Sequence, residues 1–118
     1  MKRNINIHWT SLEPLLANLI QNNRKDYIQQ RKNIIYAHRN QLLSDQLNYL
    51  IQSSDFSITE FGKPYLHTHP DFNFNHSHSQ NFYALATSNN VQNLGIDIEE
   101  LSRKVRFEAM AQHAFHPR

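Results

Sequence analysis

The sequence predicts an α+β fold in which N-terminal helices pack on a small, largely antiparallel sheet. In the first half of the chain, apolar residues recur at helical spacing. In the second half, short segments alternate apolar with polar residues, as strands do, and turn residues separate these segments. At 118 residues the chain is long enough for one domain with a modest core.

Two helical segments are predicted in the first half. The first begins at Ser11-Leu12-Glu13-Pro14, with a Thr or Ser cap and a proline that the first turn tolerates. The second begins near Arg24 and carries an apolar stripe as far as Ile51. We expect a break near residues 31–33, because an unbroken helix of this length is unusual in a globular protein. The apolar face of the first segment comprises Leu15, Leu16, Leu19 and Ile20.

Four strands and a final helix are predicted in the second half. The strands cover residues 55–60, 72–74, 82–86 and 91–98, and a loop containing Gly62 and Pro64 follows the first of them. A helix is expected from Leu101 to Phe115. Its inward side would carry Val105, Ala109, Met110 and Ala114.

Charge is distributed unevenly along the chain. Residues 1–40 contain seven lysines and arginines against two acids, and residues 41–118 contain five against eight. The basic part indicates either a surface for a polyanion or a solvated helix face. The absence of cysteine excludes disulfides and thiolate zinc sites. The N-terminus resembles neither a signal peptide nor a membrane span, so a soluble cytoplasmic protein without a membrane partner is expected.

A pair of carboxylates stands out in Gly95-Ile96-Asp97-Ile98-Glu99. Side chains alternate along a strand, so Asp97 and Glu99 should point the same way while the two isoleucines face a core. Mg²⁺ commonly binds through one or two carboxylates together with substrate phosphates. This motif therefore predicts a magnesium site.

Phosphate-binding side chains precede the carboxylates. Lys63 follows a glycine that lets the backbone approach a ligand, and it precedes Pro64. Ser77 and His78, in Phe74-Asn75-His76-Ser77-His78-Ser79, offer a hydroxyl and an imidazole to phosphate oxygens. Basic helices beside an acidic motif favour a metal–phosphate site over nucleic-acid binding.

Gly62-Lys63-Pro64, the Phe74–Ser79 motif and Gly95–Glu99 occur in the motif order of 4′-phosphopantetheinyl transferases. The chain resembles the long, pseudo-dimeric class typified by the surfactin-synthetase activator and the enterobactin-type enzymes. The resemblance covers roughly residues 24–115. It implies Mg²⁺-dependent transfer of phosphopantetheine from coenzyme A to a serine of an acyl or peptidyl carrier protein.

The resemblance also implies roles for individual residues. Arg39, Lys63, Ser77 and His78 would hold the nucleotide end of coenzyme A, with Gly62 and Pro64 shaping the turn that presents the lysine. Asp97 and Glu99 would bind the metal ion. Four further basic residues match the family pattern less closely, and their roles remain open. Arg24 and Lys25 are either phosphate ligands or solvated charges, and Arg103 and Arg106 contact the diphosphate, contact the carrier protein or cap a helix.

One departure from the family pattern concerns the C-terminal part. The family carries a W-x-x-K-E-A segment, with a further metal carboxylate and a catalytic lysine, downstream of a helix that follows the acidic strand. These 118 residues contain no such segment. Residues 1–93 are therefore expected to form the N-terminal subdomain, and residues 94–118 the start of a second one. We expect this species to self-associate and to have little activity alone.

Two alternatives to the transferase remain. Four histidines occur as His67-Thr68-His69 and His76-Ser77-His78, and imidazoles on one face of an extended chain bind Zn²⁺, Ni²⁺ or Cu²⁺. The chain would then be a transition-metal-binding module. An inactive domain that binds carrier proteins is the other alternative.

Overall fold

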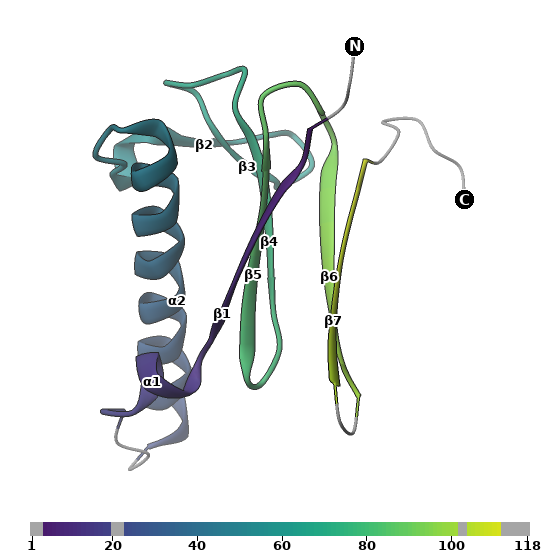
Figure 1. Cartoon of the computed structure of the whole chain (residues 1–118). Helices are drawn as coiled ribbons and strands as arrows, with labels where there is room; N and C mark the ends of the chain where they lie inside the picture. The colour runs from purple at the N-terminus through teal and green to yellow at the C-terminus, as the bar shows by residue number, and fades with distance from the viewer. Residues whose placement is uncertain (1–3, 20–22, 102–103, 112–118) are drawn as a thin grey trace.

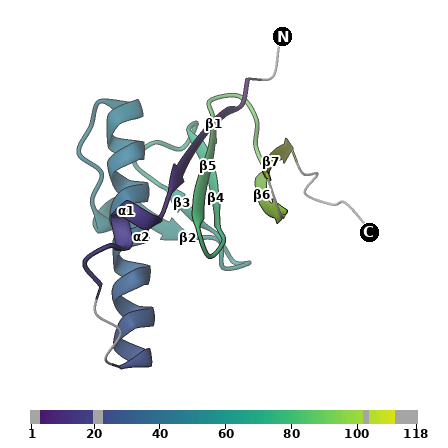
Figure 2. The same ribbon diagram turned by 60° about the horizontal axis from the view of Figure 1, so that its bottom comes forward.

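The sheet at the centre of the fold has three antiparallel strands. The computed structural model describes residues 4–19, 23–101 and 104–111. Strand β5 (Phe82–Ser88) is central and pairs on one side with β1 (Asn6–Ser11) and on the other with β4 (Asn73–His78). Figures 1 and 2 show the long helix α2 (Arg24–Leu47) along one face of this sheet. The predicted α+β class is thereby confirmed.

A hairpin covers the other face of the sheet (Figure 1). It consists of β6 (Leu94–Leu101) and β7 (Lys104–Ala111), which pair antiparallel with each other and form a separate sheet. Hydrogen bonds tie the hairpin to its neighbours: Ile96 N donates to Asn75 Oδ1, and Glu100 accepts bonds from Asn81 and Ser79. The hairpin is therefore held to the central sheet mainly by side-chain packing.

The first predicted helix is shorter than expected. Helix α1 covers only Glu13–Leu16, and Leu12 occupies its N-cap position without a side-chain cap bond. A Thr or Ser cap is wrong because Thr10 and Ser11 are the last residues of β1, paired with β5. Residues 6–10 do alternate polar with apolar residues, but the apolar Ile7 and Trp9 are exposed. The polar Thr10 faces α2, where its Oγ1 bonds His38 Nε2. Ile20 lies outside the described residues.

The predicted break in the second helix is wrong. Helix α2 is continuous, and Asn23 caps it by accepting bonds from the backbone of Lys25 and Asp26. A bond from Gln29 Nε2 to Asn33 Oδ1, at 2.9 Å, spans the expected break. Packing of the helix on the sheet outweighs the length argument. The buried positions on its inner face are Ile35, Arg39 and Leu43.

The hairpin that carries Gly62 was predicted only in part. Strand β2 (Phe56–Ile58) lies inside the predicted segment, but β3 (Pro64–Leu66) was assigned to a loop. Gly62 has a φ of 85°, a left-handed conformation that favours glycine, and it closes the turn between the two strands. Thr59 holds this turn by accepting Gly62 N and Lys63 N and by donating its N–H to Lys63 O.

The predicted C-terminal helix is wrong. Residues 104–111 form β7, in which half-buried positions 105, 107 and 109 alternate with exposed positions 106, 108 and 110. This period of two suits a strand, and the apolar side of β7 packs toward the central sheet. Leu101 is the last residue of β6, and the other expected helical residues, 102–103 and 112–115, fall outside the described residues.

Two hydrophobic clusters lie on opposite faces of β5. The larger cluster, between the sheet and α2, includes Leu12, Ile35, Leu43, Ile51, Leu66, Phe72, Phe74, Tyr83 and Leu85. The smaller cluster, beneath the β6–β7 hairpin, includes Ala84, Ala86, Val91, Leu94 and Ile96. Within the described part of the chain, no helix is both long enough and apolar enough to cross a membrane.

Leu85→Ala tests whether the α2 face of β5 carries the core. Leu85 is fully buried in the larger cluster, so the truncation should lower the free energy of unfolding by about 2–5 kcal/mol. Urea unfolding followed by circular dichroism measures this loss. Leu50→Ala is the matched control, because Leu50 is 72% exposed and its truncation should change stability by about 0.5 kcal/mol or less. Equal losses for the two variants would contradict this core assignment.

Candidate anion-binding site

Arg39 is a buried cation in the middle of α2. Its side chain is 8% exposed, and its guanidinium carbon lies 4.4 Å from the ring centre of Phe56, 4.8 Å from that of Tyr36 and 5.8 Å from that of Phe74. Its Nε donates to Asn40 Oδ1 at 3.0 Å, the one hydrogen bond that the side chain makes to described residues. The two terminal nitrogens therefore have donors left for a ligand.

Two histidines of β4 face α2 beside this arginine. His76 Nδ1 lies 3.1 Å from the hydroxyl of Tyr83, a fully buried residue of β5. The rings of His76 and His78 are 6.4 Å apart, and the ring of His76 is 5.8 Å from that of Tyr36. Because side chains alternate along β4, Ser77 points to the opposite face from both histidines. The predicted pair of Ser77 and His78 therefore does not share one face.

Arg31 extends the basic surface toward the N-terminal end of α2. Its Nη2 donates to the backbone carbonyl of Ser79 at 2.7 Å, and its Nη1 lies 3.4 Å from His78 Nδ1. A pocket of about 270 Å³ opens here between α2 and the end of β4. It is lined by Ile28, Arg31, Lys32, Ile35, Tyr36 and His78. We refer to Arg31, Lys32, Arg39, His76 and His78 as the cationic cluster.

The cationic cluster has no counter-ion in the described structure. All ten acidic residues lie in the described part of the chain, and none of them forms an ion pair with the cluster. Burial, then the charge of Arg39 and then His78, lower the pKa of His76 to about 4. Burial and the charge of Arg31 lower the pKa of His78. The electrostatic potential of the cluster therefore favours an anion.

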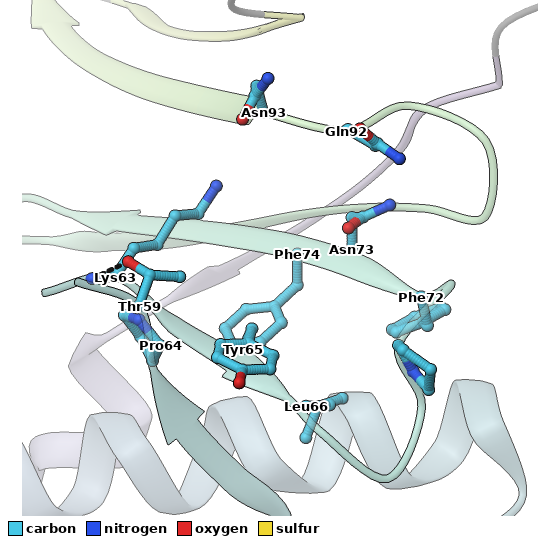
Figure 3. Close-up of a pocket in the computed structure, with 11 residues that line it drawn as sticks. Thr59, Lys63, Pro64, Tyr65, Leu66, Phe72, Asn73, Phe74, Gln92 and Asn93 are labelled. Atoms are coloured by element: carbon cyan, nitrogen blue, oxygen red, sulfur yellow. Dashed lines mark hydrogen bonds between the residues drawn. The ribbon is translucent and has the colours of Figure 1, made fainter. Parts of the chain in front are cut away.

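Lys63 lies at the edge of β4, next to the Gly62 turn. It lines a pocket of about 280 Å³ with Asn73 and Phe74 of β4, and with Asn93 just before β6. Figure 3 shows the lysine side chain extending from the turn toward Asn93. Burial lowers the pKa of Lys63. Pro64, which begins β3, lines the same pocket.

Asp97 and Glu99 lie on the exposed face of the β6–β7 hairpin. Both side chains are exposed. Ile96, which precedes Asp97 in β6, points to the inner face of the hairpin and is only 5% exposed. Across the hairpin, Glu108 is opposite Asp97 and Arg106 is opposite Glu99. The two carboxylates share a face, but that face is turned away from the central sheet. The structure therefore does not bring them together with Arg39 and His78, which lie on the far side of that sheet.

The four histidines are not assembled into one metal site. His67 Nε2 lies 2.8 Å from the carbonyl oxygen of Ser54, and the ring of His69 packs against Tyr49 at 4.7 Å, away from the cationic cluster. Among the described residues, no group of three or more His, Cys, Asp or Glu side chains is arranged to hold a metal ion. The geometry therefore gives no support to the predicted transition-metal module.

The looser sequence matches have different outcomes. Arg24 and Lys25 are exposed in the first turn of α2, and their side chains form no hydrogen bond with the cationic cluster. Arg106 is a strand residue of β7, so it does not cap a helix. Arg103 lies outside the described residues.

From the sequence, Arg31 is not identified as a site residue, and His76 is named only as a candidate transition-metal ligand. Arg31, Ile35 and Arg39 are spaced four residues apart, so the two arginines share the buried face of α2 with an isoleucine. His76 and His78 are two residues apart in a strand that has Phe74 on the same face. A basic residue within an apolar stripe is the sequence pattern that would identify these positions as candidate site residues.

The comparisons with known proteins add no relative. The chain matches no protein-family model, and no curated protein or solved structure is significantly similar to it.

The lowered pKa of His76 predicts acid-sensitive stability. As the pH falls below 6.5, the unfolded chain binds a proton at His76, whereas the folded protein binds it only near pH 4. Stability should therefore decrease between these two pH values, and His76→Gln should show a smaller decrease. Urea unfolding across this range measures the difference. His67→Gln, at an exposed histidine, should keep the wild-type pH dependence. An identical pH dependence in His76→Gln would contradict the assignment.

Proposed function

We propose that this chain is the coenzyme A-binding part of a 4′-phosphopantetheinyl transferase. In this proposal the protein acts in the cytoplasm and moves phosphopantetheine from coenzyme A to a serine of an acyl or peptidyl carrier protein. Residues 1–93 form the N-terminal subdomain, and residues 94–118 begin the second. The order of the three motifs supports the family, and the cationic cluster supports the ligand.

Arg39 is the observation that carries the proposal. A buried guanidinium without a carboxylate partner is unfavourable unless something compensates the charge. The rings of Tyr36, Phe56 and Phe74 compensate it in part through cation–π contacts. A phosphate would compensate it further, because arginine binds phosphate with two parallel hydrogen bonds. Arg39 therefore suits a phosphate-bearing ligand better than a purely structural role.

The position of Lys63 supports the idea that a single ligand extends from the cationic cluster toward β6. Its pocket contains Phe74, which contacts Arg39, and Asn93, which precedes β6. This pocket thus lies at the β4 edge between the two faces of the central sheet. In the proposal, Arg39, Arg31 and His78 hold the nucleotide phosphate, and Lys63 neutralises the diphosphate beyond it. These contacts orient coenzyme A and offset the charge that develops on the leaving phosphate.

The proposed metal ligands are Asp97 and Glu99. Their exposed carboxylates on one face of β6 are the hard oxygen donors that Mg²⁺ prefers, so the donor set fits this ion. When bound, Mg²⁺ would stabilise negative charge on the phosphate oxygens. For one coenzyme A molecule to reach both groups, the hairpin must approach the β4 edge. The hydrogen bonds of Ile96 and Glu100 to the central sheet and its β4–β5 turn, together with packing, oppose that movement.

Coenzyme A binding tests the nucleotide site. Isothermal titration calorimetry should detect binding to the wild-type protein, and Arg39→Gln should weaken it by about ten- to hundredfold, because hydrogen bonds to charged groups contribute about 1.5–3 kcal/mol. Lys63→Ala, at a less buried position, should weaken binding without disturbing the core. Lys25→Ala, at an exposed lysine of α2, is the matched control. Wild-type affinity in both site variants, or no binding at all, would contradict the proposal.

The metal assignment makes a separate prediction. Mg²⁺ should increase the affinity for coenzyme A, and Asp97→Asn and Glu99→Gln should abolish that increase while keeping the Mg²⁺-free affinity. The reason is that these carboxylates contact only the ion. Titrations with and without Mg²⁺ measure the effect, and Glu60→Gln, in the exposed β2–β3 turn, is the control. A magnesium effect that survives in both variants would show that the ion binds elsewhere.

A further inference from the structure

His76 lies where an anion and a proton can bind together. Its ring lies beside Arg39 and His78, two other members of the cationic cluster. Nδ1 is held by the Tyr83 hydroxyl, whereas Nε2 has no hydrogen-bond partner among the described residues. Tyr83 is fully buried, and burial raises the pKa of its phenol, so the hydroxyl stays neutral and fixes the ring. One ring nitrogen is thus available to a ligand.

We propose that His76 binds the phosphate-bearing ligand together with Arg39 and takes up a proton as it does so, so that anions bind this site more tightly at lower pH. This inference rests on the proposed function for the identity of the ligand. The binding of an anion by His76 and Arg39 with uptake of a proton does not depend on that function. His76 occupies the variable position of the Phe74–Ser79 motif and was not among the residues predicted to contact coenzyme A.

The surroundings of His76 explain why the proton arrives with the ligand. In the free protein, burial, the charge of Arg39 and the neighbouring His78 oppose a positive charge on the ring. No carboxylate pairs with the cluster in the described structure to offset that effect. Two titratable or charged groups of α2 face His76, namely Tyr36 and Arg39. The others are His78 on β4 and Tyr83 on β5. His38 on α2 contacts the opposite side of Tyr83.

A bound dianion reverses this local balance of charge. Next to two negative charges, the imidazolium form of His76 becomes favourable. In this form both ring nitrogens carry protons, so Nε2–H can donate to the anion while Nδ1–H donates to the oxygen of Tyr83. By linkage, a ligand that raises the pKa of a group binds more tightly when that group is protonated. The site should therefore prefer doubly charged over singly charged anions, and more strongly as the pH falls.

Calorimetry in two buffers with different ionisation enthalpies measures the proton uptake. Coenzyme A and inorganic pyrophosphate are titrated separately, at about pH 6.5, into wild-type protein, His76→Gln and the control His67→Gln. Phosphate groups titrate in the same range, so the informative quantity is the difference between wild type and His76→Gln. Wild type and His67→Gln should take up roughly half to one proton more than His76→Gln. Their affinity advantage should grow by about tenfold between about pH 7.5 and about pH 5.5.

The outcomes separate this inference from the proposed function. If pyrophosphate binds with proton uptake that depends on His76 but coenzyme A does not bind, the inference stands and the proposed function fails. If coenzyme A binds with the same proton uptake in wild type and His76→Gln, the inference is overturned and the proposed function stands. If neither ligand binds, both are overturned. Circular dichroism of His76→Gln before titration verifies that the variant is folded.

Discussion

The burial of β5 on both faces is the constraint on which the rest of the structure depends. Tyr83, Ala84, Leu85 and Ala86 are all fully buried, although they alternate between the two faces of the sheet. The large side chains point to α2 and the alanines point to the β6–β7 hairpin. Neither layer is dispensable, because a central strand without one of its covers exposes an apolar surface to water. The alanine face also allows the hairpin backbone to approach closely.

The same packing creates the cationic cluster. Because α2 lies across the face of β4 and β5 that carries Phe74 and Tyr83, the central position of its inner face is buried against the sheet. Arg39 takes that position between Ile35 and Leu43, which are core residues. A leucine there would pack without a desolvation cost. The fold therefore accepts an unfavourable charge at a central position, as proteins do at binding sites.

Much of the sheet was predictable from the sequence, but the relation between its faces was not. Alternation located β4, β5 and β6 within a few residues, because half-buried strands have a period of two. The same rule, applied to residues 104–111, predicts β7, whereas the spacing of Val105, Ala109 and Met110 is also compatible with a helix. Asp97 and Glu99 share a face, as period two requires. That this face is turned away from Arg39 depends on how the hairpin packs on Ala84 and Ala86, which is a tertiary contact that no local pattern encodes.

Through the cationic cluster, acid has opposite effects on the stability of the free protein and on ligand binding. Without a ligand, burial and the charge of Arg39 oppose protonation of His76, and burial and the charge of Arg31 oppose protonation of His78. Protonation in acid therefore introduces a repulsion that destabilises the folded state. A bound anion removes the repulsion, so it stabilises the folded state by an amount that grows with ligand concentration. Acid should therefore destabilise the free protein while strengthening the complex. If Arg39 had a purely structural role, with its charge compensated by ring contacts alone, acid would destabilise the free protein without strengthening a complex.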